Sequence, residues 1–114
     1  MMVKSTDVKT LYPLWLAGHE KSAPPCIMID VRSPEEYAQG HVPGVALIPL
    51  NALAARAHEV PKQGDVYFIC HSGGRSAQAV MFLQRECGHA NLINVSGGTM
   101  AWSQAGFEIE KGRN

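Results

Sequence analysis

The chain has 114 residues, and its ten Lys and Arg residues balance ten Asp and Glu residues. This length fits one domain that buries roughly two thirds of its unfolded surface, so we expect one domain over residues 1–114 with a core at about 5–109. The charge balance gives no sign of binding to nucleic acid or to an anionic membrane. A signal-peptide core and a run of ~18 apolar residues are both missing, so we expect a soluble, cytoplasmic protein.

Helical patterns alternate with short apolar runs along the chain. Apolar residues recur at helical spacing over residues 8–16, after the candidate caps Ser5 and Thr6, and predict a helix that stops near Gly18. Residues 26–31 then form a continuous apolar run. Such a run is typical of a strand buried on both faces of a parallel sheet.

A second helix is predicted directly after this strand. Ser33 is a suitable N-cap, Pro34 suits the first helical position, and Glu36 completes a capping box. Gly40 ends this helix. Residues 45–48 predict a second strand and residues 51–58 a short helix.

The segment after residue 64 is the most informative part of the chain. Residues 65–70 predict a strand, with an apolar run from Val66 that ends on Cys70. Two glycines follow before a helix that begins at Arg75 and stops at Gly88. Residues 92–95 predict a further strand. Gly97 and Gly98 then open a last helix, which Gly106 closes.

Strands that alternate with helices at this spacing indicate βαβ units, and therefore a parallel sheet with helices on both faces. Ligands of such sheets bind beyond the carboxyl ends of the strands. Asp30, Cys70 and Ser96 lie at or just after the ends of three predicted strands. Cys70 is therefore predicted to lie at the ligand-binding edge of the sheet.

The position of Cys70 at the start of a helix predicts a reactive thiol. Unpaired backbone amides at a helix start favour the thiolate, and we expect the amides of residues 71–76 and the charge of Arg75 to lower the pKa of Cys70. Gly73 and Gly74 let the backbone curl round one sulfur atom. His71 and Arg75 are the nearest side chains for binding an anion.

Four motifs occur in a fixed order between residues 26 and 107. They are Asp30-Val31-Arg32, then Glu36-Tyr37 with Gly40-His41-Val42-Pro43-Gly44, then Cys70-His71-Ser72-Gly73-Gly74-Arg75-Ser76, and finally Gly97-Gly98 with Trp102. Together they resemble the single-domain rhodaneses, a thiosulfate sulfurtransferase family. The resemblance implies an α/β fold with a mostly parallel central sheet of about five strands, flanked by helices on both faces.

The resemblance also implies an activity and a set of site residues. Cys70 would take sulfane sulfur from a small anionic donor, thiosulfate or a persulfide, hold it as a persulfide, and pass it to cyanide in vitro or to a thiol or protein. No cofactor or metal is implied. The loop residues that would bind the substrate are His71, Ser72, Gly73, Gly74, Arg75 and Ser76.

Three further residues are expected to support the loop, namely Asp30, Arg32 and Glu36. The resemblance suggests an ion pair between Arg32 and Glu36, although the capping box alone accounts for Glu36. Asp30 either accepts N–H bonds from the active loop or caps a turn, and the sequence leaves both interpretations open.

Two other functional classes compete with sulfur transfer. Cysteine-dependent phosphatases and arsenate reductases are related in chemistry, but phosphatases on a similar scaffold use a Cys-x5-Arg loop, whereas Cys70 to Arg75 spans only six residues. A smaller ring suits one sulfur atom better than a four-oxygen anion. The second class is a docking module or protein-to-protein persulfide carrier, which an exposed apolar rim near Trp102, Met100 and Leu50 would favour.

Several remaining residues have structural interpretations. Three cysteines without a Cys-x-x-Cys pair argue against a disulfide scaffold, and Cys26 and Cys87 are expected to pack in the core. His41 is expected to brace a loop and Trp102 to pack beside the site. Cys87 and His89 form a close Cys/His pair without further ligands at zinc spacing, which is too little for a zinc site.

Overall fold

The computed structural model describes residues 2–112, and its centre is one five-stranded sheet in the order β1-β5-β4-β2-β3. Every strand pairing in this sheet is parallel. The sheet therefore confirms the predicted parallel α/β architecture. The strands are β1 (Ser5–Asp7), β2 (Ile27–Asp30), β3 (Ala46–Leu47), β4 (Val66–Ile69) and β5 (Leu92–Ser96).

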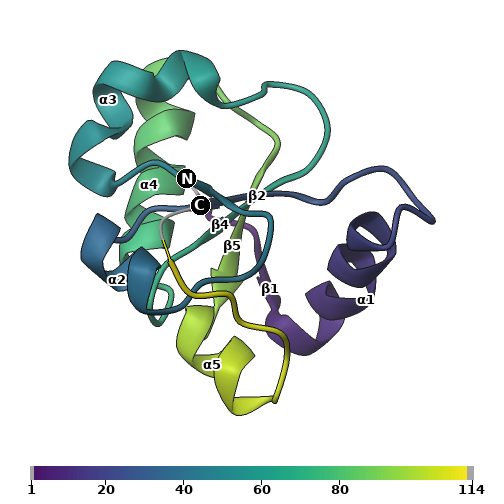
Figure 1. Ribbon diagram of the computed structural model, residues 1–114. Helices are drawn as coiled ribbons and strands as arrows, with labels where there is room; N and C mark the ends of the chain where they lie inside the picture. The colour runs from purple at the N-terminus through teal and green to yellow at the C-terminus, as the bar shows by residue number, and fades with distance from the viewer. Residues whose placement is uncertain (1, 113–114) are drawn as a thin grey trace.

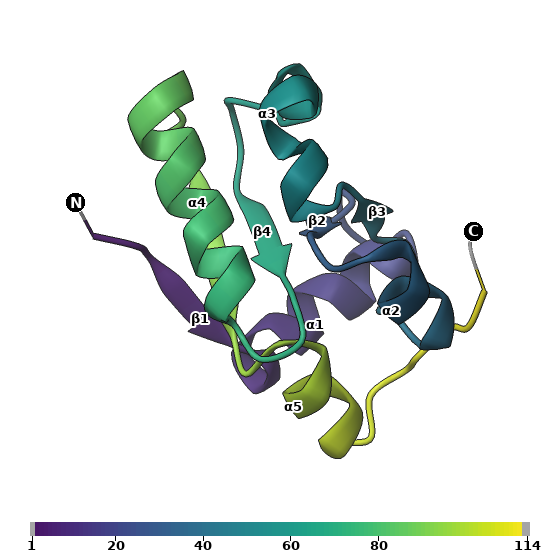
Figure 2. The same ribbon diagram turned by 90° about the vertical axis from the view of Figure 1, so that its left-hand side faces the viewer.

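Helices cover both faces of the sheet (Figures 1 and 2). One face carries α3 and α4, and the other carries α1 and α5. No helix within residues 2–112 combines the length and the apolar character needed to cross a membrane. The helices are α1 (Val8–His19), α2 (Pro34–Gln39), α3 (Leu53–Arg56), α4 (Gly74–Cys87) and α5 (Gly98–Gln104), with 3-10 turns at Leu50–Ala52 and Ala57–Glu59.

The central strand β4 is buried on both faces, which explains its continuous apolar sequence. Tyr67 and Ile69 pack in the cluster under α1 and α5, whereas Phe68 and Cys70 belong to the cluster under α3 and α4. Successive side chains of a strand point to opposite faces. This alternation directs Cys70, the residue after β4, toward the face that α4 covers.

The N-terminal prediction was wrong in one respect. Ser5 and Thr6 are not caps but belong to β1, which pairs with β5, and the N-cap of α1 is Asp7, whose Oδ1 accepts a hydrogen bond from the Thr10 N–H at 2.7 Å. A strand of three residues, two of them exposed, carries no apolar run that a periodicity argument can detect.

Two further elements test the predictions for the middle of the chain. The capping box of α2 is confirmed, because the Ser33 hydroxyl accepts from the Glu36 N–H and the Glu36 carboxylate accepts from the Ser33 N–H. The helix predicted over residues 51–58 is broken instead into α3 and two 3-10 turns. None of these three pieces has a side-chain cap hydrogen bond.

The cap of α1 can be tested by replacing Asp7. Asp7→Ala removes the acceptor of the Thr10 N–H, and we expect the Tm to fall by about 4 °C in thermal unfolding followed by circular dichroism. The hydrogen bond from Thr10 lowers the pKa of Asp7 from its ordinary value of 3.8. The stabilisation is therefore present above that value and is lost as the pH falls through the lowered pKa.

Ser5→Ala is the matched control, because Ser5 is an exposed residue of β1 and not a cap. An equal loss of Tm in both variants at neutral pH would contradict the assignment of Asp7 as the cap.

Candidate active site

The loop between β4 and α4 wraps round the sulfur of Cys70. The Gly73 N–H donates to Sγ at 3.0 Å and the Ser76 hydroxyl lies 3.3 Å from it. Gly73 has a φ of 113°, a conformation that residues with a Cβ rarely adopt. Gly74, by contrast, begins α4 with ordinary helical geometry. Only the first of the two predicted glycines is therefore required by the curvature of the loop.

The surroundings of Cys70 favour its thiolate. Cys70 is only 1 % exposed, and this burial opposes ionisation. Hydrogen bonds from the Ser76 hydroxyl and from the backbone amides of Ser76, Gly73 and Ser72 outweigh the burial and hold the pKa of Cys70 below its ordinary value of 9.0. The pKa of Cys70 is therefore lowered, as predicted, but the leading causes of the lowering are neutral hydrogen-bond donors and not the charge of Arg75.

The start of α5 holds the opposite side of the loop. The Thr99 N–H and hydroxyl both donate to the Cys70 carbonyl, at 2.8 Å and 3.0 Å, and the Met100 N–H donates to the His71 carbonyl at 3.0 Å. Gly98 permits this approach, since a Cβ there would lie 2.5 Å from both of these carbonyl oxygens. The last contact is the Gly97 N–H, which donates to the Ser72 carbonyl at 3.2 Å.

Arg75 points across the mouth of the site to Glu36 on α2, not toward the sulfur. Its two terminal nitrogens donate to the two carboxylate oxygens at 2.7 Å and 2.8 Å. The hydrogen bond from Arg75 lowers the pKa of Glu36 to about 2. The pair therefore stays ionised at neutral pH, and the carboxylate offsets the positive charge of the loop arginine.

The predicted ion pair between Arg32 and Glu36 is wrong. Arg32 instead binds Asp30, with Nη2 to Oδ2 at 2.7 Å, and donates to the Gly40 carbonyl at 2.8 Å. Asp30 also accepts from the Arg32 backbone N–H at 3.0 Å. Asp30 is fully buried, so its carboxylate needs both donors. Asp30 therefore caps the turn after β2, which is one of the two roles that the sequence left open, and its hydrogen bonds are not to the cysteine loop.

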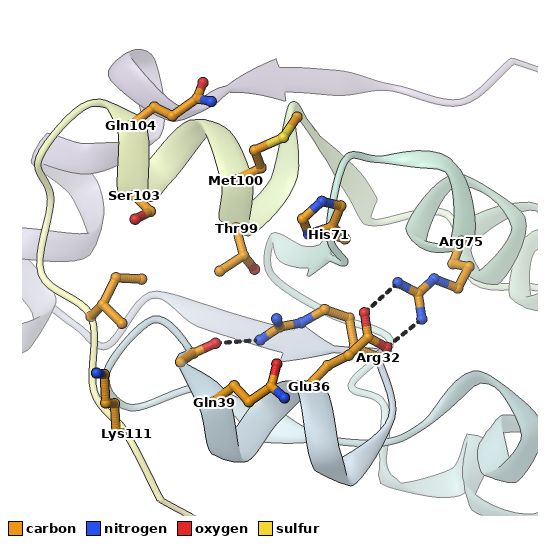
Figure 3. Close-up of a pocket in the computed structure, with 12 residues that line it drawn as sticks. Arg32, Glu36, Gln39, His71, Arg75, Thr99, Met100, Ser103, Gln104 and Lys111 are labelled. Atoms are coloured by element: carbon orange, nitrogen blue, oxygen red, sulfur yellow. Dashed lines mark hydrogen bonds and ion pairs between the residues drawn. The ribbon is translucent and has the colours of Figure 1, made fainter.

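A cleft of about 630 Å³ opens over the loop. Figure 3 shows α2 and α5 on opposite sides of it, with His71 between them and the Arg75–Glu36 pair at one end. Cys70, which is buried, is not among the residues that line the cleft. The lining residues are Arg32, Glu36, Gln39, Gly40, His71, Arg75, Thr99, Met100, Ser103, Gln104, Ile109 and Lys111.

Other predicted residues have structural positions. His41 is fully buried, stacks on Tyr37, and makes hydrogen bonds to the Tyr37 carbonyl and to Glu110, as a bracing residue does. Trp102 is also fully buried and packs in the α1 and α5 cluster. Cys26 and Cys87 are only partly buried, at the margins of the two clusters.

The sequence reasoning missed two residues at the site. Thr99 binds the Cys70 carbonyl, and Asn94 on β5 accepts from the Ser76 hydroxyl at 2.5 Å. Both side chains are buried. A signal was available for Asn94, since it is the one polar residue within the apolar run at residues 92–95. Buried polar side chains of this kind need partners.

The two loop glycines offer a matched pair of substitutions. Gly73→Ala places a Cβ on a positive φ, and we expect it to destabilise the protein by about 1 to 2 kcal/mol and to slow alkylation of Cys70. Gly74→Ala meets no atom within 4 Å of its Cβ. It should preserve the alkylation rate and leave stability equal or raised by up to about 1 kcal/mol. Urea unfolding and iodoacetamide kinetics measure both, and equal behaviour of the variants would refute the loop geometry.

Comparisons with known proteins agree with this geometry. A family model described as a rhodanese-like domain matches residues 14–105. A sulfurtransferase of Allochromatium vinosum is 37% identical over 83 residues, which cover 73% of this chain and 77% of that protein. Thiosulfate sulfurtransferase 16, chloroplastic, of Arabidopsis thaliana is 32% identical over 115 aligned positions, 90% of this chain and 89% of that protein.

A solved structure has the same fold and a related sequence. The crystal structure of a rhodanese-like domain protein from Staphylococcus aureus matches with a TM-score of 0.79 and 32% identity, covering 96% of this chain and 100% of that chain. The chain therefore belongs to the rhodanese-like domain family and is a rhodanese-like sulfurtransferase.

Proposed function

We propose that this sulfurtransferase moves sulfane sulfur from thiosulfate or a persulfide donor to a nucleophilic acceptor through a persulfide on Cys70. The observation that carries the proposal is the ring of neutral donors round the Cys70 sulfur, led by the Gly73 N–H at 3.0 Å. These donors lower the thiol pKa. A thiolate is the form that attacks a sulfur atom.

The proposed cycle has two half-reactions. In the first, the Cys70 thiolate attacks the outer sulfur of thiosulfate, a new S–S bond forms, and sulfite leaves with the electron pair of the broken S–S bond. In the second, an acceptor such as cyanide attacks the outer sulfur of the persulfide. Thiocyanate then leaves and the thiolate is restored, so the kinetics are of the ping-pong type. The Cys70 thiolate donates an electron pair to the new S–S bond and recovers one when that bond breaks, so the cycle needs no external oxidant or reductant and no cofactor.

The charged side chains at the site would attract a small anionic donor only weakly, because both arginines are paired with carboxylates. Arg75 is paired with Glu36 and Arg32 with Asp30, whereas His71 is exposed beside the loop and Lys111 lines the far part of the cleft. Backbone amides are thus the main groups that would hold an anionic sulfur. The volume of the cleft, about 630 Å³, leaves room for a thiol or a protein segment as the acceptor.

The geometry gives less support to phosphate or arsenate chemistry. The guanidinium of Arg75 faces Glu36, so it does not face the space in front of the sulfur where a tetrahedral anion would lie. The loop is also one residue shorter than Cys-x5-Arg.

The covalent step is tested by intact-protein mass spectrometry after incubation with thiosulfate. We expect a mass gain of one sulfur atom, and cyanide should remove it. Cys70→Ser should show no gain, because a hydroxyl in its place lacks the nucleophilicity of a thiolate. No gain with thiosulfate or with a persulfide donor would leave a docking module as the better account.

Cys26→Ser and Cys87→Ser are the matched controls for this experiment. Both thiols are partly buried, and burial raises the pKa of Cys26 to about 11. Each variant should gain and lose sulfur as the unmodified chain does. Loss of the mass gain in either variant would place the persulfide on a different cysteine.

Glu36→Gln tests how far the ion pair at the mouth limits anion binding. The variant keeps an oxygen acceptor for the Ser33 N–H but releases the full charge of Arg75. We expect the KM for thiosulfate to fall by about two- to fivefold, a modest change because both side chains are about one third exposed and screened by solvent. Steady-state thiocyanate formation measures it.

Glu35→Gln is the control, since Glu35 is the exposed neighbour on the same helix. The same fall of KM in both variants would mean that net charge, and not the Arg75 pair, governs donor binding.

A further inference from the structure

The hydroxyl of Ser76 has two acceptors for a single proton. Its Oγ lies 3.3 Å from the Cys70 sulfur and 2.5 Å from Oδ1 of Asn94. Ser76 is fully buried and Asn94 is 6 % exposed. Because a hydroxyl donates one hydrogen bond at a time, the Ser76 proton serves either the sulfur or the amide.

The sulfur does not need this proton in every state of the proposed cycle. In the thiolate the negative charge is on Sγ, next to the Ser76 hydroxyl. In the persulfide the charge is on the outer sulfur, about 2 Å farther out, and Sγ is neutral. The hydrogen bond from Ser76 to Sγ therefore stabilises the thiolate more than the persulfide, because a hydrogen bond to a charged atom is stronger than one to a neutral atom.

An amide side chain suits both directions of this hydroxyl. Its oxygen accepts from a hydroxyl that turns away from the sulfur, and its NH₂ group donates to a hydroxyl that turns toward the sulfur. A half-turn of the side-chain amide exchanges the two ends. Within residues 2–112, the Nδ2 end of Asn94 makes no hydrogen bond that would oppose this rotation.

We propose that Asn94 is a positioning residue that acts on Cys70 through Ser76. Its amide donates to the Ser76 oxygen while Sγ is a thiolate and accepts the Ser76 proton while Sγ is neutral. The inference rests on the proposed function, because in that cycle Sγ changes between the thiolate and the neutral sulfur of the persulfide as Cys70 takes up and releases sulfur.

The charged side chains near Cys70 are paired with one another, so neutral groups surround the sulfur. Arg75 faces the site from α4 with its charge paired to Glu36 on α2, and Asp30 at the end of β2 is paired with Arg32. Asn94 reaches the site from β5, where it is opposite Phe68 of β4. The Ser76 hydroxyl thus contacts the sulfur directly, and Asn94 contacts the Ser76 hydroxyl.

A double-substitution cycle tests the proposal, with the pH dependence of Cys70 alkylation by iodoacetamide as the readout. Asn94→Ala in the natural chain should raise the midpoint of this profile and slow alkylation about fivefold at pH values below the midpoint. The same substitution in a Ser76→Ala chain should leave the midpoint unchanged. Alkylation requires no sulfur donor, so the result is independent of whether thiosulfate forms the persulfide.

Equal midpoint shifts in the two backgrounds, or no shift in either, would overturn the proposal. Should Asn94→Ala not fold, Asn94→Asp preserves the side-chain shape but, when ionised, can only accept. Its midpoint shift should then be larger with Ser76 present than with Ser76→Ala, and equal shifts would again refute the relay. Ile93→Val is the control for a truncation in β5, since Ile93 packs in the cluster on the other face of the sheet and should not move the midpoint.

Discussion

The site depends on the hydrogen bonds between the start of α5 and the carbonyl groups of the cysteine loop. Thr99, Met100 and the Gly97 amide bind the carbonyl oxygens of three successive loop residues, beginning with Cys70. In a trans peptide the C=O and N–H groups point in opposite directions. Holding the carbonyls toward α5 therefore turns the loop amides the other way, toward the sulfur. Gly98 is required because the two backbones approach too closely for any side chain.

Much of the fold was predictable because its three central strands, β5, β4 and β2, are largely buried on both faces. A strand such as β4, with four buried residues in succession, gives an apolar run that needs no partner to be recognised. The edge strand β1 gives no such run. Its first residue, Ser5, is of a type that is common at helix N-caps. Its strand conformation comes from pairing with β5, a contact between segments about ninety residues apart that no local pattern contains.

The sequence predicted the cysteine loop itself but not the side-chain contacts that connect this loop to other elements. Cys70 and Gly73 lie within one short segment, so spacing alone predicted their proximity. The partner of Arg75 could not be predicted from the sequence, because the carboxylates of Asp30 and Glu36 can pair with the arginines in more than one way. Only the approach of α2 to α4 brings Glu36 to Arg75. Asn94 and its contact with the loop depend on the register of β5 against β4, and that register is a tertiary property.

Neutral donors are well suited to a cysteine that is loaded and unloaded with sulfur. A thiolate and a persulfide anion carry the same charge, so in the proposed cycle the site has no net charge change to accommodate, only a displacement of charge by one S–S bond. A free cation beside the sulfur would favour any anion that enters, including the product sulfite. The Arg75–Glu36 pair reduces that attraction, while hydrogen bonds from the start of α5 hold the loop carbonyls in place. A loop one residue shorter than Cys-x5-Arg suits one sulfur atom better than a four-oxygen anion, so in the proposed cycle discrimination depends on which atom reaches the loop.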